Sequence, residues 1–584
     1  MRLLLTIFII TSLSVNAQSY QAKNFDFENM DLHPPMKIPL ILSGNFGEMR
    51  SNHFHTGLDI KTRGVEGIKL YAIEEGVISR VRVSPWGYGL AVYIDHPNGL
   101  TSVYAHMQSF SPEIDSLVYS IQKKQETYIV DEIVLNQGVK VNRGEFIGLS
   151  GNSGSSAAAH LHFEIRETVT EHAINPLLFR CYRKLIRDKT KPTLKGIKVY
   201  AVTEKGYMIP GKSTYYYVRY QDGKHEVNDG NPIDVSDLVT ENSYLAFAFH
   251  VTDKLDGAGN VCGIHHTFLN KGDEVLHEQK TDYINFDHNR FLNSHQDYYE
   301  FKQNRRNIHK SFKTVINPLP IYPKAGGLIK WEECNGPYSF KAIDVHGNWI
   351  RLNFKVQNNS KSKAKNPFDK PQKYFFPDSV NTLLYEDFQV LMEPGTFYEP
   401  LQRIFRIDSS TQYLSVGYQF SESEIPVQKR FDVRIKTPEI NDHFPVNKLG
   451  IGVISNTGWM SFIGGDYISG WVEATSRDFG KFVLLVDTIP PKITPLDFNN
   501  GKNISRYRNL QLTIEDNLAG VWKYKAFING EWALMEFDRR RKRYIIHFTE
   551  HSKPLLKKGD NTIKIWANDG KGNESEGTWT VVYN

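Results

Sequence analysis

Residues 159–166, AHLHFEIR, constrain the fold more than any other stretch of this chain. Apolar and polar side chains alternate through it: Leu161, Phe163 and Ile165 against His160, His162, Glu164 and Arg166. Such alternation is typical of a half-buried strand with one polar face. His160 and His162 therefore point the same way, about 6–7 Å apart along the strand. Two interpretations stay open. In the first, one histidine binds a metal and the other reaches the open side of that metal; in the second, this is an ordinary solvent-facing strand surface. Glu164 and Arg166 share this face and either orient ligands or substrate or are solvated charges, of which the latter is the simpler interpretation.

Further strands are expected between residues 41 and 180, where short β-type runs are broken by glycine. The turn at 97–99 lies between two alternating runs and predicts a hairpin. In its second arm, SVYAHM, alternation places His106 on the more polar face of a strand. The next segment, SPEIDSLVYSIQKKQET, has apolar residues at helical spacing and predicts a short helical insertion.

The stretch HFHTGLD, residues 53–59, brings two histidines and an aspartate together. In a straight strand His55 and Asp59 would share a face but lie about 13 Å apart. Ligands of one zinc ion place their donor atoms about 2.0–2.2 Å from the ion, so the chain must bend between them. Gly57 is the residue that permits the bend. His53 competes with His55 for the ligand role on spacing alone.

These segments offer two histidines and one carboxylate as metal ligands, with further histidines nearby, and the sequence contains no HExxH helix. Three protein ligands suit a catalytic zinc site, which keeps its fourth position open. A structural zinc site would be closed and usually rich in cysteine, and the three cysteines are scattered. The glycine-rich GLSGNSGSS lacks the GK[ST] ending of a phosphate-binding loop and leads into a strand. Metal chemistry is therefore expected here, rather than nucleotide binding.

Three motifs, FGEMRSNHFHTGLDI, YAHM and VNRGEFIGLSGNSGSSAAAHLHFEI, together resemble the M23 family of zinc metallopeptidases, the LytM/lysostaphin-like peptidoglycan endopeptidases. The resemblance covers residues 44–180 and keeps the family's order of HxxxD, a YAH-type strand, G-x-[ST]-G and HxH. It implies that His55, Asp59 and His162 bind one catalytic Zn²⁺ ion. It also implies that His106 and His160 line the cleft as catalytic groups.

Some positions depart from the family pattern or have no place in it. His53 matches no ligand of the family, and GIKLYA at 67–72 replaces the family's GTPVYA without touching a ligand. The helical insertion after His106 lies beside the cleft and could alter access to it. In some members an asparagine before the domain plugs the zinc; Asn45 and Asn24 are the candidates here, and we do not expect either to act so.

The resemblance implies hydrolysis of peptide cross-links in bacterial peptidoglycan. In a Gram-negative wall the bond would be D-Ala–meso-diaminopimelate, a DD-endopeptidase activity, and glycine-bridge cleavage is less expected. A zinc-activated water would attack the scissile amide, whose carbonyl the zinc would polarise. His160 would serve as general base, and His106 would stabilise the oxyanion or protonate the leaving amine. How these two histidines divide the work stays open.

Two other functions also stay open. The first is a non-catalytic M23-like scaffold that binds peptidoglycan or activates a hydrolase through the same groove. The second is an adhesion or envelope-assembly protein that acts through the rest of the chain. A non-catalytic scaffold is expected to have lost ligand residues, whereas all five expected positions are filled here.

A repeat follows the residues that carry chemistry. DKTKPTL (188–194) is echoed by DTIPPKI (487–493), TDKLDG (252–257) by EDNLAG (515–520), and AIDVHGN (342–348) by ANDGKGN (567–573). The echoes keep their order and lie among alternating aromatic and β-branched residues, which predicts tandem β-sandwich modules that resemble immunoglobulin-like domains. Aspartates in the turns, Asp253, Asp256, Asp344 and Asp569, either bind Ca²⁺ or form the turns, and turn formation is the commoner role.

The expected fold class is thus mainly β. An antiparallel-β peptidase domain of the LytM type, with a short helical insertion, is predicted at 18–188 after a signal peptide at 1–17. β-Sandwich modules are predicted at 189–370, 371–487 and 488–584. The first of these modules is long and must carry an insertion.

Residues 1–17, MRLLLTIFIITSLSVNA, are typical of a secretory signal peptide, with Arg2, an apolar run and a small-residue cleavage site ending at Ala17. We expect export across the inner membrane and a periplasmic or cell-surface location. The expected substrate is the stem peptide of peptidoglycan, and the β modules could hold envelope proteins. No later segment approaches about 20 apolar residues, so no transmembrane segment is expected after cleavage.

Composition excludes two further classes of protein. A net charge of +5, from 70 basic and 65 acidic residues, is too small and too evenly spread to indicate nucleic-acid binding. Three cysteines exclude a disulfide scaffold. They allow one bridge at most, with Cys262–Cys334 as a candidate pair, and leave at least one thiol free.

Overall fold

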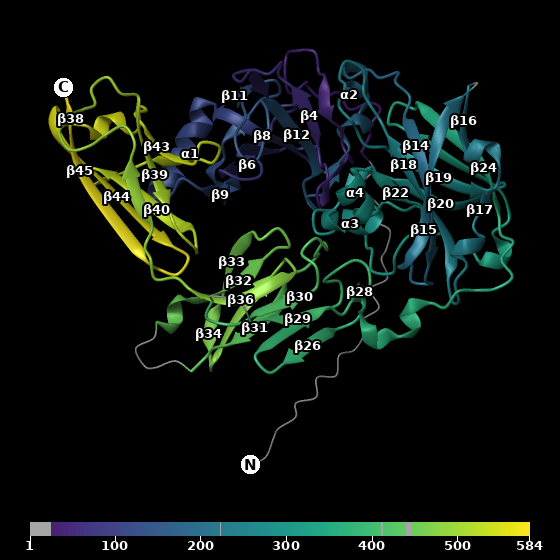
Figure 1. The fold of residues 1–584 in the computed structure, drawn as a ribbon. Helices are drawn as coiled ribbons and strands as arrows, with labels where there is room; N and C mark the ends of the chain where they lie inside the picture. The colour runs from purple at the N-terminus through teal and green to yellow at the C-terminus, as the bar shows by residue number, and fades with distance from the viewer. Residues whose placement is uncertain (1–24, 222, 410–412, 440–444) are drawn as a thin grey trace.

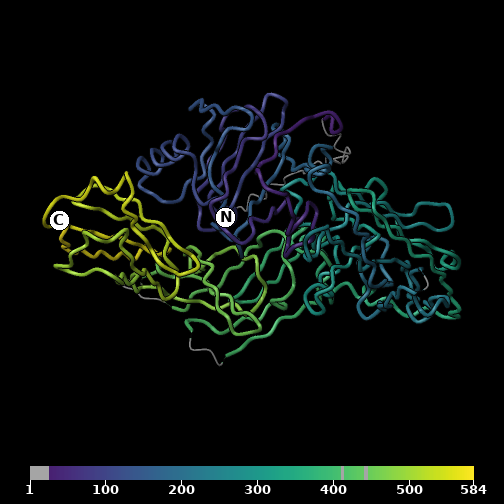
Figure 2. The backbone as a smooth tube through the Cα atoms, turned by 90° about the horizontal axis from the view of Figure 1, so that it is seen from above, coloured from purple at the N-terminus to yellow at the C-terminus, as the bar shows by residue number. Residues whose placement is uncertain are grey.

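The computed structural model describes residues 25–221, 223–409, 413–439 and 445–584, and the predicted signal peptide at 1–17 lies outside these ranges. The described chain is built mainly of β-strands, and most of their pairings are antiparallel. Four β regions follow one another along the chain, and the C-terminal region returns to lie beside helix α1 (Pro112–Gln125) of the first (Figures 1 and 2). The expected mainly-β class is therefore confirmed.

The N-terminal sheet carries the motif residues. Its central strands run in the order β1 (Leu42–Gly44), β4 (Leu58–Lys61), β12 (His160–Glu167), β8 (Leu100–Phe110), β7 (Leu90–Asp95), β6 (Gly76–Val83) and β10 (Lys140–Val141). Short strands extend it: β5 (Lys69–Tyr71), β9 (Val130–Ile133), β11 (Phe146–Ser150), β13 (Ala173–Ile174) and β21 (Tyr283–Ile284). The predicted hairpin joins β7 to β8, and the predicted helical insertion is α1.

The second region holds a ten-stranded sheet and begins after the short helix α2 (Arg180–Leu185). Its strands are β14 (Thr193–Val202), β15 (Met208–Gln221), β16 (Lys224–Val227), β17 (Ile233–Asp234), β18 (Tyr244–Thr252), β19 (His266–Lys271), β20 (Glu274–Lys280), β22 (Ile308–Lys310), β23 (Gly336–Ile343) and β24 (Trp349–Gln357). Helices α3 (Leu292–His295) and α4 (Tyr298–Asn304) precede β22.

The two regions share a core. Ile284, Phe291 and Leu292 belong to the same buried cluster as Leu58 and Phe163 of the N-terminal sheet. β21 also pairs with β13, which adds a strand from the second region to the first sheet. Burial of this much apolar surface stabilises the arrangement of the two regions.

The third and fourth regions each pair two sheets over one core. The third has β26 (Asn381–Tyr385), β27 (Phe388–Met392), β31 (Phe431–Lys436), β35 (Trp471–Ser476) and β34 (Asp466–Ile468) against β29 (Phe405–Asp408), β30 (Gly417–Phe420), β36 (Gly480–Val486), β32 (Leu449–Ile454) and β33 (Met460–Gly464). The fourth has β37 (Lys492–Pro495), β39 (Asn509–Glu515), β43 (Arg543–His547) and β42 (Met535–Asp538) against β38 (Lys502–Asn503), β45 (Glu574–Tyr583), β44 (Gly559–Asp569), β40 (Val521–Ile528) and β41 (Glu531–Ala533). An immunoglobulin-like topology of these regions stays a prediction.

The cysteines are free thiols throughout the described chain, so the bridge considered between Cys262 and Cys334 is not formed. Cys262 is buried in the core of the N-terminal region and Cys334 in that of the second region, which keeps the two thiols apart. Among the described helices, none is both long and apolar enough to cross a membrane.

Candidate active site

Pairing of β4 with β12 places Asp59 directly opposite His162, and the chain just before β4 adds His55. His55 Nε2 lies 3.0 Å from His162 Nδ1 and 3.1 Å from Asp59 Oδ1, and the latter two atoms lie 2.9 Å apart. Ligands about 2.0–2.1 Å from a tetrahedral zinc ion are about 3.3 Å from one another. These three atoms therefore fit one zinc ion with only a small outward movement, and all three residues are buried.

Hydrogen bonds on the far side of each imidazole orient the two histidines. His55 Nδ1 donates to the carbonyl oxygen of Asn45 at 2.8 Å, and His162 Nε2 donates to Glu164 Oε1 at 2.8 Å. In the neutral imidazoles these bonds leave lone pairs on His55 Nε2 and His162 Nδ1, the atoms that face Asp59. The side chain of Asn45 pairs with the backbone of Gly263 and does not plug the site, while Asn24 lies outside the described residues.

Gly57 bends the chain between His55 and Asp59, although not for the expected reason. Its φ lies outside the left-handed region, so conformational freedom is not what requires glycine. A Cβ atom here would lie 2.4 Å from the carbonyl oxygen of Phe163 and 2.9 Å from Cγ of Glu164. Glycine is needed because β12 passes too close for any side chain.

His106 and His160 lie beside the three donor atoms, with their ring centroids 4.8 Å apart. His106 occupies a bulge, because β8 has one residue more than β7 between two paired positions, and its φ is +59°. A left-handed histidine is strained, and such strain is concentrated at functional sites. His106 Nδ1 donates to the carbonyl oxygen of Ser153 at 2.9 Å, while His160 Nε2 lies 3.4 Å from Asp59 Oδ1.

Burial sets the protonation of most of this cluster. It lowers the pKa of His55 to about 4 and that of His106 to about 3, so both are neutral at pH 7. Burial opposes protonation of His162 as well, but hydrogen bonds to Asp59 and Glu164 raise its pKa to about 9. Burial alone would raise the pKa of Asp59, yet contacts with His55 and its neighbours hold it well below its usual range. A cation bound at the three donors would displace the proton of His162.

Glu164 is the site residue that the alternation pattern misjudged. The interpretation of Glu164 and Arg166 as solvated charges is wrong: they are 0% and 4% exposed. Glu164 Oε1 accepts hydrogen bonds from Thr56 and Tyr88, both at 2.5 Å, besides the one from His162, and Arg166 Nε donates to Oε2 at 2.7 Å. The guanidinium of Arg166 stacks on Phe286 of the second region, 4.2 Å from the ring centroid, which helps to cover this face. The sequence did contain a signal for this contact: Glu164 follows His162 by two residues, so the two side chains lie on the same face of β12.

Replacement of Glu164 by glutamine is expected to weaken zinc binding by about 10–100-fold, because His162 loses the carboxylate that orients its ring. The buried guanidinium of Arg166 also loses its partner, which should destabilise the fold by about 3 kcal/mol. Chelator competition and thermal unfolding measure the two effects. Glu167→Gln is the matched control, since Glu167 lies on the same strand and bonds Thr170 instead. Wild-type zinc affinity in Glu164→Gln would contradict the orienting role.

The C-terminal region contacts the loop at residues 152–156, which includes the Ser153 carbonyl that accepts the hydrogen bond from His106. Arg540, in the turn between β42 and β43, donates to the carbonyl oxygens of Asn152 and, at 2.8 Å, of Ser156. The adjacent Arg539 lies over the ring of Trp86, 4.8 Å from its centroid. These contacts fix the loop whose Ser153 carbonyl accepts from His106.

Arg540→Ala is therefore expected to lower kcat/KM by about 10-fold with no change in zinc content, since a displacement of 1 Å near the chemistry can cost about 10²-fold. Arg541→Ala is the control: Arg541 is a neighbour in the same turn that pairs with Asp538. Equal activity of the two variants would show that the contact does not position His106.

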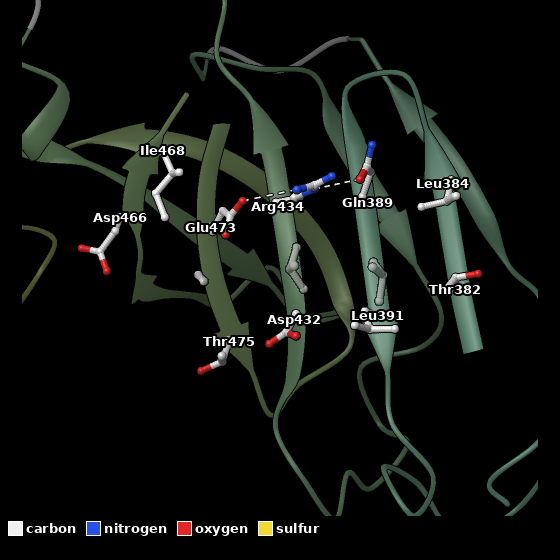
Figure 3. A pocket seen from close by; sticks show the side chains of 13 residues that line it. Thr382, Leu384, Gln389, Leu391, Asp432, Arg434, Asp466, Ile468, Glu473 and Thr475 are labelled. Atoms are coloured by element: carbon white, nitrogen blue, oxygen red, sulfur yellow. Dashed lines mark hydrogen bonds and ion pairs between the residues drawn. The ribbon is translucent and has the colours of Figure 1, made fainter. Parts of the chain in front are cut away.

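His53 lies outside the cluster; its side chain is exposed, and its Nδ1 contacts the carbonyl oxygen of Ser51. A separate pocket of about 590 Å³ lies in the third region (Figure 3). Arg434 crosses it between Gln389, at 2.7 Å, and Glu473, at 3.3 Å. Its lining residues include no histidine or cysteine.

Comparison with known protein families agrees with this site. The model of peptidase family M23 matches residues 53–125 and 118–176, which contain all five motif residues. The N-terminal domain is thus an M23-type peptidase domain, and the predicted resemblance is confirmed. Residues 372–487 match the model of a Zu5-like domain.

Relatives of known name match about a fifth of the chain. The chain is 32% identical over 123 residues to the DD-carboxypeptidase/endopeptidase Mpg of Neisseria meningitidis serogroup B, which is 21% of this chain and 22% of that protein. It is 30% identical over 99 residues to the peptidoglycan DD-endopeptidase ShyA of Vibrio cholerae, 17% of either chain. The chain therefore spans only about a fifth of the length of these relatives.

Solved structures align with about a quarter of the chain. The catalytic domain of lysostaphin from Staphylococcus simulans has 22% identity and a TM-score of 0.19, covering 24% of this chain and 91% of that one. The catalytic domain of the prophage-encoded M23 protein EnpA from Enterococcus faecalis has 24% identity and a TM-score of 0.18, covering 24% and 89%.

Proposed function

We propose that this protein is a zinc-dependent endopeptidase that hydrolyses peptide cross-links of bacterial peptidoglycan, with DD-endopeptidase specificity. The observation that carries the proposal is the set of three donor atoms 2.9–3.1 Å apart, with two further histidines beside them. The names of the two relatives, both of which include DD-endopeptidase or endopeptidase activity, support the substrate.

We assign His55 Nε2, Asp59 Oδ1 and His162 Nδ1 as the zinc ligands. When bound there, zinc would supply Lewis acidity for the scissile carbonyl and lower the pKa of a coordinated water from 15.7 toward about 7. Glu164 and the carbonyl of Asn45 hold the two imidazoles in the tautomers that ligation requires.

We assign proton transfer to His160 and a contact with the substrate to His106. His160 Nδ1 donates to the carbonyl oxygen of Ala158 at 2.8 Å, so the neutral ring presents Nε2 as an acceptor next to Asp59. That atom suits a general base, which takes a proton from the attacking water and passes it to the leaving amine. His106 likewise presents Nε2 as an acceptor because Nδ1 donates to Ser153. This tautomer favours a contact with an N–H of the substrate over stabilisation of an oxyanion.

We also propose the location and organisation that the sequence predicts. Export across the inner membrane would bring the protein to its substrate in the periplasm or at the cell surface. We propose a peptidase domain at 18–188 followed by β modules at 189–370, 371–487 and 488–584, the modules being available for envelope partners.

Metal removal tests the proposal. Chelation is expected to abolish the release of soluble fragments from purified peptidoglycan, and one equivalent of Zn²⁺ should restore it, because the three donors hold one ion. The readout is the rate of sacculus digestion with the same protein before chelation, after it, and after zinc is returned. Activity that survives complete zinc removal would contradict the proposal, and absence of activity in the zinc-loaded protein would favour the scaffold.

A further inference from the structure

Three buried aspartates meet where the N-terminal domain joins the second region. Asp188 lies between α2 and β14, Asp253 directly follows β18, and Asp344 directly follows β23. One carboxylate oxygen of each lies within 4.8 Å of those of the other two. The residues are 8%, 2% and 4% exposed, so water does not screen their mutual repulsion.

Two oxygens of this cluster have no hydrogen-bond partner. They are Asp188 Oδ2 and Asp253 Oδ1, on side chains that are more than nine-tenths buried. Among the described residues, no lysine or arginine forms an ion pair with any of the three carboxylates. A buried carboxylate without a partner is costly, and it normally either takes up a proton or binds a cation. Burial and the nearby Asp344 raise the pKa of Asp253 to about 8, which expresses the same cost.

Turn formation does not account for the cluster. Asp344 does form a turn, since its Oδ1 accepts from the backbone N–H groups of His346 and Asn348 at 2.8 and 2.9 Å. Asp253 makes no comparable side-chain bond with Oδ1, and Asp188 uses only Oδ1, for the backbone N–H groups of Thr190 and Asp256. The convergence of three carboxylates from separate segments of the chain therefore needs another explanation.

The same arrangement recurs at the junction before the C-terminal region. Asp487, Asp516 and Asp569 converge in the same way, and Asp569 repeats the turn bonds of Asp344. One neighbour differs: Lys571 follows Asp569 by two residues, and its ammonium group donates to the carbonyl oxygen of Gly465. His346 occupies that place in the first cluster. The second cluster thus has a lysine close by in sequence where the first has a histidine, and among the described residues neither cluster forms an ion pair with a lysine or arginine.

We propose that Asp188, Asp253 and Asp344 bind one Ca²⁺ ion at the junction between the peptidase domain and the second region. Ca²⁺ takes six to eight oxygen ligands in a flexible geometry, which suits carboxylates that come from separate segments of the chain. Mg²⁺ demands a stricter octahedron and gives up its water reluctantly, and zinc prefers nitrogen and sulfur ligands.

Binding there would fix the linker between the two regions. Asn348 Nδ2 donates to the carbonyl oxygen of Asp188 at 3.3 Å, and His346 Nε2 donates to that of Ile186 at 2.6 Å. The turn that begins at Asp344 therefore already holds the linker, and an ion shared by Asp188 and Asp344 would lock the two together. This role is independent of the proposed hydrolysis.

Calcium titration of the zinc-loaded full chain tests the proposal. Isothermal titration with CaCl₂ should show that Asp253→Asn has one Ca²⁺ equivalent fewer than wild type, and saturating Ca²⁺ should raise the Tm of the wild type by about 5 °C. Asp188→Asn, which alters the linker instead of β18, should lose the same equivalent. Asp273→Asn, in an exposed turn of the same region, is the control and should bind as wild type does.

The Tm measured in EDTA distinguishes Ca²⁺ binding by Asp253 from a purely structural role of this residue. If the cluster binds Ca²⁺, Asp253→Asn relieves repulsion, so in EDTA its Tm should equal or exceed that of the wild type. A lower Tm in EDTA together with unchanged Ca²⁺ stoichiometry would overturn the proposal. So would an equal shift in Tm when MgCl₂ replaces CaCl₂ at the same concentration.

Discussion

Replacement of His162 by alanine is expected to remove bound zinc and to lower kcat/KM on cross-linked peptidoglycan by at least about 10³-fold. His162 Nδ1 is the atom that contacts both His55 Nε2 and Asp59 Oδ1, so its loss leaves two donors where a catalytic site needs three. Loss of a Lewis acid worth several kcal/mol corresponds to a rate change of this size. Elemental analysis of the purified variant measures zinc, and circular dichroism verifies the fold.

His53→Ala is the matched control for this experiment. His53 lies two residues before His55, but its side chain is exposed and its Nδ1 contacts the carbonyl oxygen of Ser51. We expect wild-type zinc content and activity from it. If His53→Ala lost its zinc while His162→Ala retained it, the assignment of ligands would be wrong.

Replacement of Gly57 by alanine is expected to separate β4 from β12 and to disable the site without touching a ligand. The new Cβ would lie 2.4 Å from the Phe163 carbonyl oxygen, a backbone atom that cannot move aside alone. Overpacking of this kind costs about 1–3 kcal/mol of unfolding free energy. Because Asp59 faces His162 across the same strand pair, a shift of about 1 Å there should also cost about 10²-fold in kcat/KM.

Thermal unfolding and zinc content together measure the effect of Gly57→Ala. Gly259→Ala is the control, since a Cβ at position 259 meets no atom within 4 Å and its φ is not left-handed. Wild-type Tm and activity in Gly57→Ala would show that the strands tolerate a wider spacing and that the close approach is not required.

Strand alternation was enough to predict which histidines share a face. It placed His160 and His162 together on β12, and the spacing of His55 and Asp59 predicted the bend at Gly57. These features depend on residues close in sequence, where a period of two decides which way a side chain points. The hairpin of β7 and β8 and helix α1 were predictable for the same reason.

Features that depend on distant residues were not predictable in this way. Glu164 looked solvated because its cover comes from Tyr88 and, through Arg166, from Phe286 of another region. The bulge at His106 breaks the strict alternation from which its orientation was predicted. The anchoring of the loop at Asn152 by Arg540 joins residues 388 positions apart, and no local pattern reports such a contact.

The most direct test of the central claim is mass spectrometry of the muropeptides that zinc-loaded wild-type protein releases from purified sacculi. We predict that dimers joined through a D-Ala–diaminopimelate cross-link decrease and that monomers with intact stem peptides increase in equal measure. His162→Ala should leave the dimers unchanged. Persistence of the dimers with the wild-type enzyme, or the same loss of dimers with His162→Ala, would contradict the account.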